Sequence, residues 1–276
     1  MDESLHPSHP YARGGWLSLA VLALAGLGAV IWANTWKSDL RVKEVRVEGN
    51  RTVRAEEILA AAAIQKSERL FDVDLFAAAR RVSQNHFLKS VSVTREVPGR
   101  ISISVVERVP LAAVVQNELL YVDGEGYVLP PVRSENIFDI PVVTGSFPKD
   151  ELVPGRHISS GFMQEAISVL VLAQRIDDHL YRKISEVHVD GSNDLVFYTA
   201  EAGVPVIVGH EDIGMKLVKF DSFWKQLVER RGARELQYID LRFQDQVIVK
   251  WNQDKGKERE VSSMRGRECS RGGDVT

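Results

Sequence analysis

The feature that most constrains this chain is an uninterrupted apolar run close to its start. Residues 16–33 read WLSLAVLALAGLGAVIWA, and a single serine is the only polar side chain among them. As a helix the run would be about 27 Å long, and the flanking residues out to Trp36 carry it past the roughly 30 Å of a bilayer core. Trp16, Trp32 and Trp36 stand near its two ends, where indole rings favour the membrane surface. The sequence therefore predicts a transmembrane helix over residues 16–36, after a short tail over residues 1–15.

A cleaved signal peptide is the alternative to an uncleaved anchor. Ala23-Leu24-Ala25 resembles a cleavage site, but cutting there would leave a hydrophobic core of only about seven residues. It would also leave an apolar stub from Leu27 to Trp36 on the mature protein. We expect an uncleaved anchor, whose membrane-facing side chains are Trp16, Leu17, Leu19, Val21, Leu22, Leu24, Leu27, Val30, Ile31 and Trp32.

The charges on the two sides of this anchor do not decide which side of the membrane each end lies on. The tail before it carries one basic residue, Arg13, whereas Lys37, Arg41, Lys43 and Arg46 follow it. The positive-inside rule, applied literally, would place the large remainder of the chain in the cytoplasm. The rule is weak for long translocated domains, so the charges do not decide the orientation.

The overall composition is that of a folded protein with nearly balanced positive and negative charge. Lys+Arg number 35 and Asp+Glu 38, so the net charge is −3. This near balance argues against a nucleic-acid binder held by a basic field. The one cysteine, Cys269, allows neither an intramolecular disulfide nor a cysteine-rich zinc site. The chain must therefore be held together by its hydrophobic core.

A first folded unit is expected over residues 37–109, in the order βααββ. Asp74 is a plausible N-cap for its second helix, whereas Arg54, before the first helix, is a poor one. Pro98-Gly99 is a turn pair. Such a unit has an α+β design, with strands around Val42–Val47, Val91–Val93 and Ile101–Val105 and helices over Arg54–Ile64 and Leu75–Gln84.

A second, larger unit is expected over residues 110–252, and a disordered tail over 253–276. Asp123-Gly124 is the strongest hairpin signal in the chain. Amphipathic helices are expected over Gly161–Asp177 and Asp212–Arg230. The pattern predicts a mixed α/β domain with a large, mostly antiparallel sheet, whose strands cover Leu111–Val115, Leu119–Val122, Tyr127–Leu129, Ile140–Thr144, Ile184–Val189, Leu195–Thr199, Val204–Val208, Leu236–Phe243 and Gln246–Trp251.

The sequence shows no catalytic or ligand-binding motif. It has no G-x-S-x-G, H-E-x-x-H or P-loop, and no dinucleotide-binding glycine pattern. Asp177-Asp178-His179 is read as a solvated helix end, and Asp74 as a cap. We therefore predict no catalytic, metal or cofactor residues and no small-molecule substrate. The seven histidines are interpreted as satisfied surface or cap residues: His6, His9, His86, His157, His179, His188 and His210.

The last strand before the predicted tail is a natural edge of the sheet. An edge strand has unpaired N–H and C=O groups that another chain can satisfy by adding a strand. The alternation predicts two faces for the terminal hairpin. Ile239, Leu241 and Phe243 would face the core, and Tyr238, Asp240 and Arg242 would face outward. In the second strand, one face would carry Val247, Val249 and Trp251 and the other Ile248 and Lys250.

Several motifs, in their order, carry a resemblance. VEGN, then LFDVD, a Val-Ser-Val strand, Pro-Gly with Ile-Ser-Ile, and ERVP resemble a POTRA domain, a polypeptide-binding module, over residues 37–109. VDGEGYVLPP and YIDLRFQDQVIVKW resemble two hairpins of the β domain found in the FtsQ/DivIB family of bacterial division proteins. The resemblance covers nearly all of Leu40 to Trp251.

The resemblance implies a scaffold in the cell inner membrane, with a short cytoplasmic N-terminus, a periplasmic remainder and enrichment at the division septum. It implies a non-enzymatic link between early and late division proteins that controls septal peptidoglycan synthesis. FtsB, and with it FtsL, would bind the terminal hairpin, and upstream proteins such as FtsK would bind the POTRA domain. Carried over by position, the hairpin candidates are Arg242, Phe243, Asp245, Lys250 and Trp251.

Two other functional classes stay open from the sequence. One is an anchored extracytoplasmic enzyme such as a peptidase or cell-wall hydrolase, which would need a nucleophile–base or metal constellation. The other is a POTRA-bearing chaperone or translocation component. Proteins of that second class usually carry repeated POTRA domains or a β-barrel, and this chain shows one such domain and no run of amphipathic strands at its end.

Overall fold

A computed structural model describes residues 15–115, 118–132, 138–145, 151–189, 195–243 and 246–252. The predicted N-terminal tail up to residue 14, the candidate Asp245 and the predicted tail over 253–276 lie outside these residues. The chain divides into two compact units between Arg108 and Val109.

The first element is the long helix α1 (Gly15–Asp39), of 25 residues. Its described side chains are Trp16 and those of residues 18–32, so the anchor candidate Leu17 lies outside them. The large apolar side chains among these are exposed over more than half of their surface: Trp16, Leu19, Val21, Leu22, Leu24, Leu27, Val30, Ile31 and Trp32. Within the described part of the chain, no helix combines the length and the hydropathy required of a membrane span.

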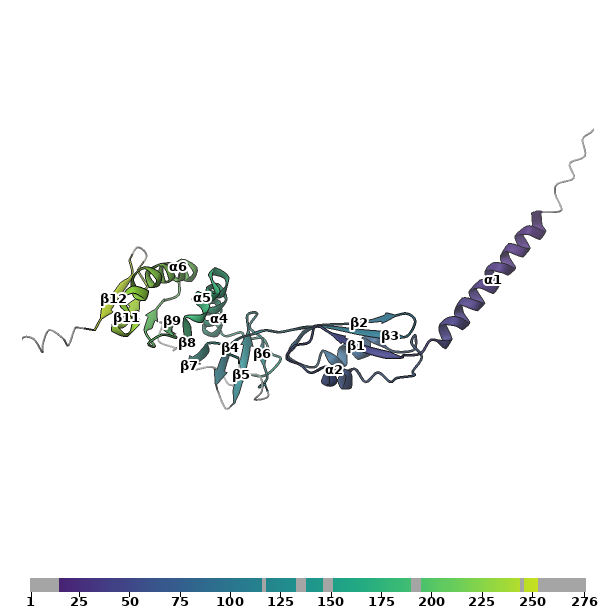
Figure 1. Ribbon diagram of the computed structural model, residues 1–276, viewed down its shortest axis with the longest axis horizontal. Helices are drawn as coiled ribbons and strands as arrows, with labels where there is room; N and C mark the ends of the chain where they lie inside the picture. Colours follow the sequence, from purple (N-terminus) through teal and green to yellow (C-terminus); the bar gives the residue numbers. More distant parts are fainter. Residues whose placement is uncertain are drawn as a thin grey trace, which may run out of the picture. The chain divides into compact units, whose positions relative to one another are not determined.

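The rest of the first unit has the predicted βααββ order. Its elements are β1 (Glu44–Glu48), α2 (Ala55–Ala62), α3 (Leu75–Val82), β2 (Leu88–Glu96) and β3 (Arg100–Glu107). The sheet order is β1-β3-β2, with β1 parallel and β2 antiparallel to the central β3. Helix α2 packs against α3 and β1, and α3 packs against β2 (Figure 1).

Local chemistry explains where the two short helices begin and end. Asp74 caps α3 as predicted, because its Oδ1 accepts a hydrogen bond from the Ala77 N–H at 2.9 Å. Arg54 before α2 makes no side-chain cap. The carbonyl of Ala62 at the other end of α2 instead accepts a hydrogen bond from Arg81 of α3. The two helices thus satisfy one another's polar groups.

Glu107 at the end of β3 fixes the loop that follows β1. Its carboxylate accepts hydrogen bonds from the backbone N–H groups of Arg51, Thr52 and Val53, at 2.8–2.9 Å. Burial by itself raises the pKa of Glu107, but the three backbone donors together outweigh it and hold the pKa below its ordinary value. The ionised form is therefore the one that holds the loop.

The second unit is built on one sheet of nine strands. Its order is β12-β11-β10-β9-β8-β7-β4-β5-β6. The strands are β4 (Pro110–Val115), β5 (Leu119–Asp123), β6 (Val128–Leu129), β7 (Val142–Gly145), β8 (Ile184–Val189), β9 (Leu195–Thr199), β10 (Pro205–Ile207), β11 (Leu236–Asp240) and β12 (Ile248–Trp251). Antiparallel pairs outnumber parallel ones, as expected, and the parallel pairs are β4–β7, β7–β8 and β10–β11.

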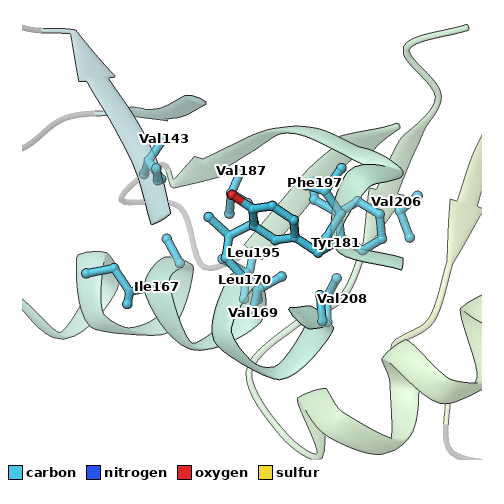
Figure 2. Packing of buried hydrophobic residues seen from close by; sticks show 14 of the residues in the cluster. Val143, Ile167, Val169, Leu170, Tyr181, Val187, Leu195, Phe197, Val206 and Val208 are labelled. Carbon is cyan, nitrogen blue, oxygen red and sulfur yellow. The ribbon is translucent and has the colours of Figure 1, made fainter. Parts of the chain in front are cut away.

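The helices of this unit bury one face of the sheet. They are α4 (Gly161–Ile176), α5 (Asp178–Arg182), α6 (Ile213–Phe223), the π-helical segment Trp224–Val228, α7 (Glu229–Arg231) and the 3₁₀ turn Ala233–Glu235. Figure 2 shows Val169 and Leu170 of α4 close to Val187 of the sheet, in the same buried cluster as Ile167 and Phe197. Tyr181 enters this core and donates its hydroxyl to the Leu111 carbonyl at 2.7 Å. Burial raises the pKa of Tyr181 to about 12, with a further contribution from Asp139.

The segment Asp177-Asp178-His179 is a solvated helix end, as interpreted: Asp177 ends α4, and Asp178 and His179 are exposed. It also opens a second short helix, α5, which was not predicted, because Asp177 accepts a hydrogen bond from the His179 N–H at 2.9 Å and caps it. A five-residue helix is too short to show a hydrophobic period, so the sequence pattern could not separate it from α4.

Gly49 in the VEGN motif predicts a sensitive position in the first unit. It has φ +88°, and a Cβ there would lie 2.1 Å from the backbone oxygen of Val105. We expect Gly49→Ala to destabilise the unit by about 3 kcal/mol or more, measured by thermal and urea unfolding of the full chain. The matched control is Gly214→Ala in α6, where nothing lies within 4 Å of the new Cβ. It should leave stability unchanged or raise it, and equal losses in both variants would contradict the assignment.

Candidate partner-binding edge of the sheet

The terminal hairpin forms one margin of the large sheet. Strand β12 pairs only with β11, so among the described residues no strand lies beyond it. The opposite margin, β6, is covered by a following loop. There the Val128 N–H donates to the Arg156 carbonyl at 2.9 Å, and the Gly155 N–H donates to the Val128 carbonyl at 2.8 Å. The structure confirms the prediction that the last strand is the edge of the sheet.

The backbone bonds of β11 fix which way the amides of β12 point. The Leu241 N–H donates to the Ile207 carbonyl of β10 at 2.8 Å. Because successive residues of a strand direct their backbone groups to opposite sides, those of Tyr238 and Asp240 point the other way, toward β12. Their cross-strand partners in β12 are Lys250 and Ile248.

It follows that alternate residues of β12 direct their amides away from the sheet. Ile248 and Lys250 face β11, and Asn252 continues this parity, since its N–H donates to the Glu235 carbonyl at 2.7 Å. The N–H and C=O groups of Val249 and Trp251 therefore point outward along the free edge. They offer a row of donors and acceptors to a further strand.

The side chains of β12 follow the two predicted faces. Val247, Val249 and Trp251 pack against the hydrophobic core, Ile248 is half-buried and Lys250 is exposed. The guanidinium carbon of Arg231 lies 4.3 Å above the Trp251 ring, within cation–π range. Arg231 in turn pairs with Glu235 at 3.4 Å. Trp251 is thus held between the core and an arginine.

Two face assignments in β11 and its extension were wrong. Asp240, expected outside, is buried, and Phe243, expected in the core, is 45% exposed. The reason is that β11 ends at Asp240, three residues earlier than predicted. The strand alternation therefore does not extend to Phe243, which stands on the exposed turn of the hairpin.

A compact ionic clamp ends the strand at this point. The Asp240 carboxylate accepts hydrogen bonds from the Arg242 backbone N–H at 3.0 Å and from its Nε and Nη2 at 3.1 and 2.8 Å. The Arg242 stem passes Gly209, where a Cβ would lie 3.2 Å from the arginine Cγ. Buried Lys216 approaches from α6 and donates to the Val208 carbonyl at 2.9 Å.

The clamp keeps Asp240 ionised. Hydrogen bonds from the Arg242 side chain lower the pKa of Asp240 below its ordinary value, and the charges of Arg242 and Lys216 add to this against the effect of burial. The predicted contact residue Arg242 therefore already has a structural partner in the unbound chain, although its side chain stays 45% exposed.

Of the five candidates for the hairpin, the structure describes four. Arg242 and Phe243 lie on the turn side of the hairpin, Lys250 and Trp251 lie on its edge strand, and Asp245 is outside the described residues. No pattern in the sequence predicted the stacking of Arg231 on Trp251. The polar contact of Asn252 with Gln237, at 2.8 Å, was likewise not expected.

Two of the histidines in the described part of the chain, His188 and His210, lie beside acidic side chains. His188 Nδ1 lies 2.8 Å from the Thr144 hydroxyl, which also donates to Glu186. In a catalytic triad the acid contacts the imidazole nitrogen opposite to the nucleophile, whereas here both groups lie beside Nδ1. His210 Nδ1 lies 2.7 Å from Glu165. No group of three metal-ligating side chains occurs among the described residues.

Two family models together span most of the chain. The model described as "POTRA domain, FtsQ-type" matches residues 40–108, and that described as "FtsQ/DivIB, C-terminal related" matches residues 109–250. The chain is similar to cell division protein FtsQ of Geotalea daltonii, with 27% identity over 86% of this chain and 85% of the relative. FtsQ of Syntrophotalea carbinolica is 30% identical over 83% of both chains. Cell division protein DivIB of Clostridium tetani is 28% identical over 75% of this chain and 78% of the relative.

The clamp makes the stability of the second unit depend on pH through Asp240. Because its pKa is lowered on folding, the ionised form stabilises the fold above about pH 4, and this contribution is lost as the pH falls through the folded-state pKa. We expect Asp240→Asn to cost about 1–2 kcal/mol at pH 7 and clearly less at pH 3, measured by urea unfolding. Exposed Asp178→Asn is the control and should change little at either pH. A loss for Asp240→Asn that does not vary with pH would refute the ionic clamp.

Proposed function

The chain belongs to the FtsQ/DivIB family of bacterial cell division proteins, and from this premise we propose that it is a membrane-anchored scaffold that makes and breaks no covalent bonds. It links early to late division proteins and thereby controls septal peptidoglycan synthesis by other enzymes. The membership itself places the chain among cell division proteins. The observation that carries the mechanism is the free edge of β12, with its outward amides.

Binding at this edge proceeds by strand addition. A segment of FtsB, which brings FtsL with it, pairs with β12 and satisfies the outward N–H and C=O groups of Val249 and Trp251. Backbone hydrogen bonds contribute affinity whatever the side chains of the partner are. Specificity therefore comes from the side chains that lie beside the edge. Phe243 offers exposed apolar surface and Lys250 offers positive charge, while Arg242, whose guanidinium is paired with Asp240, offers the exposed part of its side chain.

The anchor in this proposal is helix α1. Its 25 residues would be about 37 Å long, and residues 16–36 contain no charged side chain. Exposed apolar side chains on every side of a helix are favourable in lipid and costly in water. Confinement to the inner membrane raises the effective concentration of partners anchored in the same bilayer.

The orientation follows the family, with the short N-terminus in the cytoplasm and both folded units in the periplasm. The basic residues after the anchor oppose this only weakly, because they form part of a fold that is translocated as a whole. The N–H groups of Val42 and Lys43, for example, are bonded to Glu68 and Gly99 of the first unit. The first unit, the POTRA domain, would contact upstream proteins such as FtsK.

Strand addition predicts a specific effect of proline at position 249. Val249→Pro removes an N–H that points away from β11, on the side where no described strand lies, and proline is tolerated at such edge positions. We expect it to reduce capture of FtsB from detergent-solubilised membranes at least about tenfold, the equivalent of about 1.4 kcal/mol. Val249→Ala keeps the N–H and loses the same packing, so it is the matched control and should retain capture.

A second arm tests the side-chain contact. Phe243→Glu alters an exposed residue, so the melting temperature should stay within about 2 °C while FtsB capture is lost. Trp251→Glu is less informative, because it also disrupts packing on the core and under Arg231. If Val249→Pro and Val249→Ala capture FtsB equally, and Phe243→Glu captures it fully, the assignment of β12 as the FtsB-binding edge is contradicted.

The cellular role predicts the location of the protein. A fluorescent fusion of the full chain should accumulate at the septum of dividing cells. Removal of residues 16–36 should abolish this accumulation, since both folded units would no longer be attached to the membrane. A uniform envelope signal from the intact fusion would favour a general chaperone or an anchored enzyme over a division scaffold.

A further inference from the structure

Three exposed apolar side chains gather at one end of the first unit. Phe76 is 89% exposed, Val97 55% and Phe71 43%. Phe76 lies in the first turn of α3, Phe71 in the loop before it, and Val97 in the turn between β2 and β3. An exposed phenylalanine lowers the solubility of a protein and adds no packing energy to the isolated fold. A cluster of such side chains therefore indicates a contact surface.

Backbone pairing places the loop of Phe71 at the point where α1 ends. Leu40, the residue after α1, accepts a hydrogen bond from the Leu70 N–H at 2.8 Å, and Val42 exchanges bonds with Ser67 and Glu68 at 2.9 Å. The two segments therefore run antiparallel. The chain that continues past Leu70 to Phe71 consequently runs back toward the end of α1.

The other two side chains are held at the same end. The Lys43 N–H, just before β1, donates to the Gly99 carbonyl at 2.7 Å, which ties the Val97 turn to the start of the first strand. Arg95, near the end of β2, donates to the carbonyl of Leu70 at 2.9 Å and to that of Val73. This arginine fixes the loop that leads into α3 and Phe76.

We infer that this end of the first unit, through Phe71, Phe76 and Val97, inserts into the headgroup region of the same bilayer that α1 crosses. The inference rests on the proposed anchor. A transmembrane helix that ends one residue before Leu40 leaves the bonded Leu40–Leu70 pair within a few ångströms of the membrane surface. Exposed aromatic side chains there are buried by lipid, as in interfacial anchors.

The inserting side chains are apolar, and several of the charges beside them are paired with one another. Arg100 lies 3.1 Å from Glu44 and 3.4 Å from Glu96, and Arg69 lies 3.9 Å from Asp72. Burial of these apolar side chains by lipid does not require anionic headgroups. We therefore expect insertion in membranes with and without anionic lipid. Its consequence is to fix the tilt of the first unit on the membrane.

Spin labels on the full chain test the inference. In a Cys269→Ser background, single cysteines replace Phe76, Leu24 within α1, or Glu48 at the far end of β1. The labelled chains are reconstituted in phosphatidylcholine nanodiscs, with and without phosphatidylglycerol. Frequent collision of the spin label with oxygen indicates that the label lies in lipid. Frequent collision with a water-soluble nickel complex indicates that it lies in water. We expect lipid at position 24, the interface at 76 and water at 48, in both lipid mixtures.

The other outcomes separate the inference from the anchor on which it rests. Lipid at 24 with water at 76 would overturn the membrane contact and leave the anchor standing. Water at 24 would overturn both. Protection of 76 from both reagents would also overturn the inference and indicate a protein contact instead, which dilution with unlabelled chain would identify as a second copy. In a Phe71→Ser/Phe76→Ser variant, a label at Val97 should gain several-fold in nickel accessibility, with no change in melting temperature.

Discussion

The backbone of a sheet must be satisfied on both sides of every strand, and among the residues that the structure describes no strand meets that requirement on the outer side of β12. At the opposite margin, the loop around Arg156 bonds to β6 and covers it. At β12, the parity set by the Leu241–Ile207 bond turns the amides of Val249 and Trp251 outward. Water can satisfy these groups, so the fold is stable alone. A strand that replaces that water gains ordered hydrogen bonds along a margin that is already held rigid.

The rigidity of this margin comes from contacts at both ends of the hairpin. The Asp240–Arg242 clamp ends β11, and the stem of Arg242 rests on Gly209. At the other end, Asn252 bonds to Glu235 and Gln237, and Arg231 stacks on Trp251. A preformed edge loses little conformational entropy when a partner binds. The same contacts explain why Arg242 and Trp251, which look like free contact residues in the sequence, also have structural roles.

The sequence predicted regular elements well and their terminations poorly. The strands Ile184–Val189 and Leu195–Thr199 have the expected bounds. Buried and less buried residues alternate along all of Leu195–Thr199 and, after an irregularity near Ile184, along Val187–Val189. Asp74 was recognised as a cap because capping is a local interaction. The surroundings of the Asp240–Arg242 clamp depend instead on Lys216 and Gly209, which lie far away in sequence. Phe243 is exposed because β11 ends at Asp240. No periodic pattern carries that information, so the edge was predictable while the contacts at its end were not.

The two surfaces proposed for binding select partners of different chemical character. The edge of β12 is satisfied only by backbone groups in an extended conformation, so it selects a strand. The cluster of Phe71, Phe76 and Val97 is apolar and selects an apolar environment, which in the inference above is the bilayer beside the proposed anchor. The proposed anchor alone would leave the first unit free to rotate about residue 40, whereas a second point of membrane contact would remove most of that freedom. Restricting the orientation of the first unit would in turn reduce the entropy lost when partners in the same membrane assemble on it.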